Sequence, residues 1–292
     1  MVCVTVLEVI QRSTDFLARK GVDSPRLQVE LLLAHVLDLP RLQLYLNFER
    51  SLSPAELDAL RRLIQRRGER EPLQHLVGST SFCGLELQVT RDVLVPRPET
   101  EALAERAWQF LGTVNAAAPE VLDLGTGSGC LAIALAVKCP NSRIQAVDLS
   151  EAALEIARTN ARRHGLLNRI AFHRGDAFAA LPPGLRFDLI VSNPPYIPSA
   201  EIASLMPEVR DHDPRLALDG GSDGRDFYRR FAAEAAGWLR PGGRMMLEFG
   251  DGEAPALRPI FESHNWIVEC VAEDYSGEPR ILAVTVVNLT AR

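Results

Sequence analysis

The chain has 292 residues, 47% of them hydrophobic and 24% charged, which at roughly 150 residues per domain allows one large or two moderate globular domains. Its 32 basic and 38 acidic residues give a net charge of −6, so it lacks the basic surface with which duplex DNA binders contact phosphates. The longest strictly apolar run, Leu131 to Val137, is far shorter than the roughly 20 residues of a membrane-spanning helix. We therefore expect neither direct nucleic-acid binding nor membrane association.

Cysteine usage favours a reducing, cytoplasmic location. The five cysteines include no C-x-x-C pair and no close cysteine and histidine cluster, which argues against a disulfide framework and a zinc site. No metal is implied, and the N-terminus lacks the basic and apolar regions of an export signal. The cysteines are Cys3, Cys83, Cys130, Cys139 and Cys270.

Residues 1–75 predict a small domain of four or five short helices without strands, which we interpret as a substrate-recognition domain. Asp23-Ser24-Pro25 and Ser53-Pro54 each place a polar capping residue before a proline suited to a first helical turn. This segment carries 11 basic and 10 acidic residues, whereas the remainder carries 21 and 28, a balance of −7. The two parts therefore differ electrostatically.

An arginine cluster near the end of this segment has two interpretations. It is either a solvated helix face or a docking patch for an acidic protein partner. The cluster comprises Arg61, Arg62, Arg66, Arg67 and Arg70.

Residues 76–96 alternate apolar and polar positions between glycines, which predicts a β-hairpin that joins two domains. The segment Pro96 to Glu101 then predicts an extended turn, because its two prolines disfavour helix just before them, and a helix follows from about 98 to 112. Glu99 and Glu101 either line an active site or only stabilise the start of that helix. Phe82 and Arg97 either contact a ligand or serve only in core packing and surface solvation.

Residues 97–292 alternate short apolar runs with helical segments, which predicts an α/β domain with a mostly parallel sheet and helices on both faces. No convincing helix separates the last two runs, so we expect an antiparallel hairpin at the edge. The expected strands are 121–124, 144–147, 170–173, 187–191, 245–249, 266–271 and 281–287.

A glycine-rich turn follows the first of these strands, where it allows a ligand to approach the backbone closely. Asp148 stands 21 positions after Gly127, at the end of the next strand, where a carboxylate can accept hydrogen bonds from ribose hydroxyls. Both NAD and S-adenosylmethionine (SAM) satisfy this pattern.

Two features favour SAM. Asp123 lies inside the strand end, where it suits the ammonium group of a methionine moiety, and Asp176-Ala177 follows the third strand, where it suits an adenine. These loops resemble those of class I SAM-dependent methyltransferases, with a Rossmann-like seven-stranded sheet. The cofactor-binding residues expected are Asp123, Gly125, Thr126, Gly127, Ser128, Gly129, Asp148, Asp176, Ala177 and Asn193.

The fourth strand is followed by Asn193-Pro194-Pro195-Tyr196, which suits methylation of a planar nitrogen. The lone pair of such a nitrogen is delocalised, so its N–H groups must be held by acceptors that turn the lone pair toward the methyl donor. Asn193 Oδ1 and the Pro194 carbonyl supply two acceptors, and Tyr196 can pack on the flat group. We expect Asn193, Pro194 and Tyr196 to be catalytic, and these residues together with Pro195 to bind substrate.

Several further motifs make the chain similar to the HemK/PrmC-type release-factor glutamine methyltransferases. This resemblance implies that SAM is the methyl donor, that S-adenosylhomocysteine is the product, and that the acceptor is the N5 amide of the glutamine in the Gly-Gly-Gln motif of class I release factors. Ala177 departs from the family, which often has a larger side chain beside the adenine. Besides the loops above, the motifs are 96–101, 207–210, 217–221 with 223–224, 228–229 and 241–243.

Four alternative functions can each be distinguished from this one by a specific feature. A DNA adenine methyltransferase shares the tetrapeptide but needs a positive groove, which the −7 balance opposes. A ribosomal-protein glutamine methyltransferase would use identical chemistry and differ only in its recognition domain. An NAD-dependent oxidoreductase does not explain the proline loop, and a non-catalytic SAM-binding protein would not depend on Asn193.

Overall fold

The computed structural model describes residues 4–287 and divides into two compact units. One unit extends to Ser79 and also includes Met206–His212; the other comprises Thr80–Leu205 and continues from Asp213. No local sequence pattern indicates that a segment beyond residue 200 joins the N-terminal helices. Each unit has its own core.

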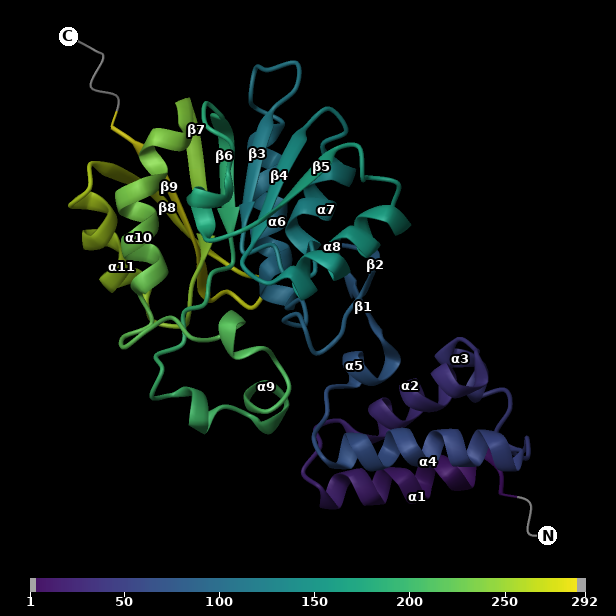
Figure 1. Ribbon diagram of the computed structural model, residues 1–292. Helices are drawn as coiled ribbons and strands as arrows, with labels where there is room; N and C mark the ends of the chain where they lie inside the picture. The colour runs from purple at the N-terminus through teal and green to yellow at the C-terminus, as the bar shows by residue number, and fades with distance from the viewer. Residues whose placement is uncertain (1–3, 288–292) are drawn as a thin grey trace. The chain divides into compact units, whose positions relative to one another are not determined.

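The first unit is helical, as expected, and packs its apolar side chains into one core. Ser53 caps its helix through a reciprocal pair with Glu56, so the prediction there is confirmed. Ser24 makes no cap, because its left-handed backbone (φ 47°) leaves only Pro25 at the expected position. The helices, shown in Figure 1, are α1 (Val6–Arg19), α2 (Pro25–Leu37), α3 (Arg41–Leu44), α4 (Pro54–Gly68), α5 (Leu73–Val77) and α9 (Pro207–Arg210).

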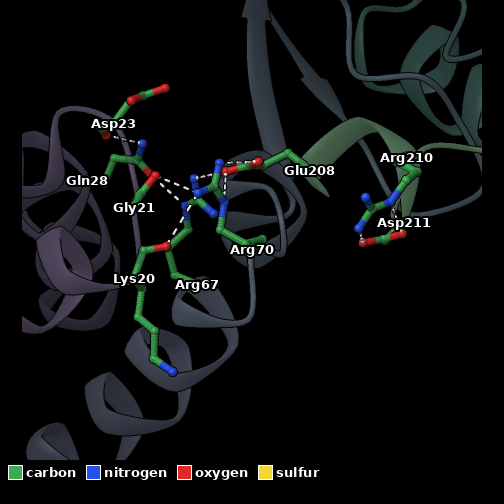
Figure 2. Close-up of polar contacts among 9 residues, drawn as sticks. All are labelled: Lys20, Gly21, Asp23, Gln28, Arg67, Arg70, Glu208, Arg210 and Asp211. Carbon is green, nitrogen blue, oxygen red and sulfur yellow. Dashed lines mark hydrogen bonds and ion pairs between the residues drawn. The ribbon is translucent and has the colours of Figure 1, made fainter. Parts of the chain in front are cut away.

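Glu208 of α9 binds two arginines of this unit (Figure 2). Its Oε1 accepts from Arg67 Nη2 and Arg70 Nε, each at 2.7 Å, and its Oε2 accepts from Arg70 Nη2 at 2.7 Å. Arg67 is only 3% exposed and also donates to Gln28 Oε1 at 2.5 Å. Burial opposes ionisation of Glu208, but the hydrogen bonds from Arg70 and Arg67 leave its pKa below the ordinary value.

This arrangement changes the interpretation of the arginine cluster. Arg67 and Arg70 are held by Glu208, and Arg66 binds Glu71 at 2.5 Å. Arg61 pairs with Asp58 at 2.9 Å. Most of the cluster is therefore engaged inside the unit.

The second unit contains a seven-stranded sheet in the order β5-β4-β3-β6-β7-β9-β8 (Figure 1). The first five strands in this order are parallel, and β9 runs antiparallel to both β7 and β8. The seven-stranded fold and the antiparallel edge hairpin are thus confirmed. The strands are β3 (Glu120–Leu124), β4 (Arg143–Asp148), β5 (Ile170–Arg174), β6 (Phe187–Ser192), β7 (Leu239–Glu248), β8 (Trp266–Glu273) and β9 (Pro279–Val286).

Helices cover both faces of this sheet (Figure 1). Alternate residues of β3 point to opposite faces, so Val121 packs with α6 and α7 whereas Leu122 packs with α10 and α11. A separate hairpin of β1 (Ser79–Phe82) and β2 (Leu85–Gln88) precedes α6. The helices are α6 (Pro98–Leu111), α7 (Cys130–Lys138), α8 (Glu151–Arg163), α10 (Asp226–Glu234) and α11 (Ala254–Glu262).

Between residues 4 and 287, no helix is both long and apolar enough to cross a membrane. Cys3 lies outside the described residues, and the other four cysteines form no disulfide.

We expect Glu208→Ala to release the 206–212 segment. Removing this carboxylate leaves Arg67 buried without a counter-charge, which costs about 3 kcal/mol, or roughly a 100-fold change in a local opening equilibrium. Hydrogen exchange in a peptide spanning 206–212 should accelerate by about that factor. Glu201→Ala, at an exposed position nearby, is the control; equal exchange in the two variants would contradict the proposed anchoring.

Candidate active site

The site lies where β3 and β6 end side by side. Leu124 pairs with Ser192 at the carboxyl end of both strands, and Ser192 Oγ donates to the Leu124 carbonyl at 2.6 Å. Because the strands are parallel, the glycine turn after β3 and the proline loop after β6 leave the same edge of the sheet. Between them lies a cavity of about 330 Å³.

Eight of the expected site residues line this cavity, so residues from four strand ends meet as the sequence predicts. Asp123, Thr126, Ser128, Gly129 and Tyr196 do not line it. The eight that do are Gly125, Gly127, Asp148, Asp176, Ala177, Asn193, Pro194 and Pro195.

Asp148 at the end of β4 holds the glycine turn in place. Its Oδ2 accepts from the Gly127 N–H at 2.8 Å, and its Oδ1 accepts from the Ser150 N–H at 2.9 Å. Burial raises the pKa of Asp148, although these N–H groups partly oppose the shift. Each carboxylate oxygen retains a second lone pair that can accept from a ligand hydroxyl.

Asp123 is fully buried behind the glycine turn. Its Oδ2 accepts from Thr126 Oγ1 at 2.7 Å and from the Ala132 N–H at 3.2 Å. Burial raises the pKa of Asp123 to about 7, and Oδ1 has no hydrogen-bond partner among the described residues. A cationic group nearby would satisfy that oxygen and favour the ionised carboxylate.

Asp176 follows β5, as expected, but its carboxylate is already engaged. Arg230 of α10 forms an ion pair with Asp176 Oδ1 and also donates to the Asp176 carbonyl at 3.2 Å. Ala177 lies in the left-handed region with φ 48°, a conformation that non-glycine residues adopt rarely.

The proline loop is held by the segment 217–224, whose motifs contribute to the family resemblance. The Ile197 N–H donates to the Leu218 carbonyl at 3.0 Å, and the Gly220 N–H donates to the Ile197 carbonyl at 2.9 Å. A Cβ at Gly220 would lie 2.8 Å from both the Pro195 carbonyl oxygen and Tyr196 Cα, and one at Gly224 would collide with the Tyr196 carbonyl oxygen. Only glycines allow this close backbone approach.

The Asn193 side chain is oriented by Thr100 in the first turn of α6. Asn193 Nδ2 donates to Thr100 Oγ1 at 3.1 Å. An amide that uses its nitrogen in this way leaves its oxygen free to accept from a ligand in the cavity.

Two further groups with shifted pKa values are the buried Glu248 beside this loop and the partly buried Tyr196 within it. Glu248 ends β7 and is 2% exposed; burial raises its pKa to about 7, and hydrogen bonding from Thr100 opposes the shift. Tyr196 packs against Gly250, and burial together with the charge of Glu248 raises the pKa of Tyr196 to about 12. This value keeps the phenol protonated at neutral pH.

The acidic neighbours Glu99 and Glu101 were candidate site residues, but Thr100 was not. The Glu101 carboxylate accepts from the Cys83 N–H at 2.7 Å and so anchors the hairpin. Phe82 is buried in the core, and Arg97 binds Asp213 at 2.7 Å. The cavity walls that sequence reasoning missed include Arg91, Val93, Leu94, Leu216, Phe227 and Phe231, which no motif marked.

Comparisons with known proteins give a consistent result. Residues 8–78 match the family model described as PrmC N-terminal domain, and residues 107–208 match that described as Methyltransferase small domain. The release factor glutamine methyltransferase of Geobacter sulfurreducens is 46% identical, over 95% of both chains. That of Chlorobaculum tepidum is 44% identical, over 96% of both chains.

A methyltransferase structure from Pyrococcus furiosus shares the fold, with a TM-score of 0.53 and 21% identity over 75% of this chain and 97% of that one. The two units, the cavity at the strand ends and the near full-length relatives thus agree, and the chain belongs to the release factor glutamine methyltransferase family.

Proposed function

We propose that the protein transfers a methyl group from SAM to the side-chain amide nitrogen of the glutamine in the Gly-Gly-Gln motif of class I release factors. The observation that carries this proposal is the Asn193 side chain in the cavity wall, with its nitrogen bound to Thr100 and its oxygen free to accept. Near full-length relatives named for this reaction support the substrate.

The cavity and the groups behind it fit SAM in three respects. Asp148 in the cavity wall offers acceptors for ribose hydroxyls. Asp123 lies outside the cavity lining, behind the glycine turn, and its Oδ1, which has no hydrogen-bond partner among the described residues, suits a cationic ammonium group reached directly or through water. Glycine turns with positive φ at Gly125 and Gly127 leave room for close backbone contact. We propose that Asp176 Oδ2 and the Ala177 N–H contact the adenine. Oδ2 is the oxygen available for this contact, because the ion pair with Arg230 uses Asp176 Oδ1.

Asn193 and Pro194 would hold the two N–H groups of the substrate amide through their carbonyl oxygens. This turns the nitrogen lone pair toward the donor before the methyl group moves. Bound SAM supplies a methyl group on a sulfonium sulfur: the S–C bond breaks as the N–C bond forms, S-adenosylhomocysteine leaves as a neutral thioether, and the amide proton passes to water. Tyr196, neutral at its raised pKa, would contribute a packing surface.

We assign recognition of the release factor to residues 1–75, joined by residues 76–96 to a methyltransferase domain of residues 97–292. The match of residues 8–78 to a PrmC-specific family supports this division of labour. Because Glu208 and Glu71 bind three of the clustered arginines, docking should depend less on that cluster than a free patch would. We also propose a cytoplasmic location, which the free thiols of the described cysteines support.

The reaction should be detectable with methyl-labelled SAM. We expect label on an unmethylated release factor and none on a copy whose motif glutamine is alanine, because only the amide nitrogen accepts the methyl group. A ribosomal protein fraction and duplex DNA serve as separate acceptors. Label on ribosomal protein or DNA but not on the release factor would overturn the proposed substrate, and label on the alanine copy would overturn the proposed atom.

Asn193→Ala should lower kcat by about 100-fold, since one oriented hydrogen-bond partner of the reacting group is lost, and should raise the Kd for SAM by a smaller factor, since Asn193 is only one of the expected cofactor contacts. Steady-state kinetics and calorimetric titration with SAM measure the two effects. Unchanged methyl transfer would contradict the role of the Asn193 oxygen.

Asp148→Asn should weaken SAM binding by about 10- to 100-fold, because the variant loses a charged acceptor for both the ligand and the glycine turn. Calorimetric titration with SAM measures the change. Glu155→Gln is the matched control: this exposed carboxylate lies on the following helix and pairs with Arg158. If the two variants bind SAM equally well, Asp148 is not a ligand.

A further inference from the structure

We propose that Thr100 and Glu248 form a polar relay that fixes the side-chain amide of Asn193 with its oxygen toward the substrate. Both are positioning residues, which act through Asn193. This inference rests on the function proposed above. It gives a role in that reaction to two residues that the sequence motifs left without one.

A relay is needed because the two ends of a side-chain amide have similar shapes but opposite hydrogen-bonding roles. Asn193 can present either its oxygen or its nitrogen to the cavity by rotating about its last side-chain bond, and only the oxygen accepts from a substrate N–H. The bond from Asn193 Nδ2 to Thr100 Oγ1, at 3.1 Å, selects the productive orientation.

That selection depends on Thr100 itself, because a hydroxyl also has a hydrogen to donate. A hydroxyl that donated to Asn193 would hold the amide the other way round. Thr100 is 2% exposed, so water does not readily take up its hydrogen. In its bond with Asn193, the Thr100 hydroxyl is the acceptor.

Glu248 provides the complementary acceptor. Its Oε2 is buried and lacks a hydrogen-bond partner among the described residues, while both Thr100 and Asn193 lie close enough to lower its pKa. An ionised carboxylate accepts and never donates. The hydrogen of Thr100 is therefore drawn to Glu248, which leaves its lone pairs for Asn193 Nδ2.

The backbone fixes Glu248 in this place. Tyr228 Oη donates to the Glu248 carbonyl at 2.8 Å, and the Phe249 N–H donates to the Arg280 carbonyl at 2.9 Å. The other groups that bear on this carboxylate come from neighbouring elements: Glu99 on α6 disfavours its charge, and Arg280 on β9 favours it. Tyr196 lies beside it in the proline loop.

Glu248→Gln and Thr100→Val should each lower kcat on the release factor by about 10- to 100-fold, which corresponds to one charged hydrogen bond. The Kd for SAM and the melting temperature should change little, and Thr100→Ser, which keeps the hydroxyl, should restore most of kcat. The double variant should be no slower than either single variant, because both substitutions abolish the same orientation of the Asn193 amide. Glu101→Gln, on the same helical turn but bound to the hairpin, is the matched control.

The pH profile separates this role from simple packing. Burial raises the pKa of Glu248 to about 7, so kcat of the natural protein should fall as pH decreases through that region and the carboxyl becomes a donor. In the Glu248→Gln variant, kcat should not show this fall at low pH. Unchanged kcat in either single variant, or losses that multiply in the double variant, would overturn the relay.

A titration of the free protein tests the relay independently of methyl transfer. Carbon-13 resonances of labelled glutamate carboxylates, assigned by difference from Glu248→Gln, report the pKa of Glu248. Thr100→Val should raise this pKa, and Thr100→Ser should leave it near its original value. No shift would overturn the relay even if the natural protein methylates release factors, and a shift would support it even if the acceptor proved to be another protein.

Discussion

The parallel pairing of β3 with β6 is the constraint on which the site depends. Leu124 and Ser192 end these strands in register, so the glycine turn and the proline loop, which we propose face the methyl donor and the methyl acceptor, start next to each other. Transfer between two ligands requires their reacting atoms to meet within bonding reach. The order of strands in the sheet achieves this before any side chain is considered.

The second constraint is chemical: a planar amide nitrogen needs acceptors rather than a strong base. In the proposed site, Asn193 and Pro194 supply these acceptors, and a hydrogen bond to the buried Thr100 orients Asn193. Thr100 begins α6 and Glu248 ends β7, so two elements far apart in the chain converge behind Asn193. Gly220 and Gly224 bring a third segment against the same loop. The loop is thus held on several sides in a geometry suited to its reaction.

Local patterns carried most of what the sequence could predict. Apolar runs marked the strands, and the glycines of the β3 turn, with φ values of 70°, 54° and 81°, marked a backbone conformation that other residues resist. Contacts between distant positions left no such mark: Thr100 and Asn193 are 93 positions apart, and Arg70 and Glu208 are 138 apart. Ser24 shows the limit of local rules, because a left-handed backbone prevents an ordinary capping residue from capping.

The excursion of residues 206–212 into the helical unit also bears on how such enzymes diversify. A domain that is joined to the rest of the chain by one linker can be exchanged for another through a single recombination point in the gene. Here two arginines of the helical unit, Arg67 and Arg70, take their ion-pair partner, Glu208, from a segment that follows β6 in the chain. Replacing the N-terminal helices alone would leave that glutamate without its arginines, so exchanging the helical unit, to which we assign substrate recognition, requires two separate stretches of the gene to change together.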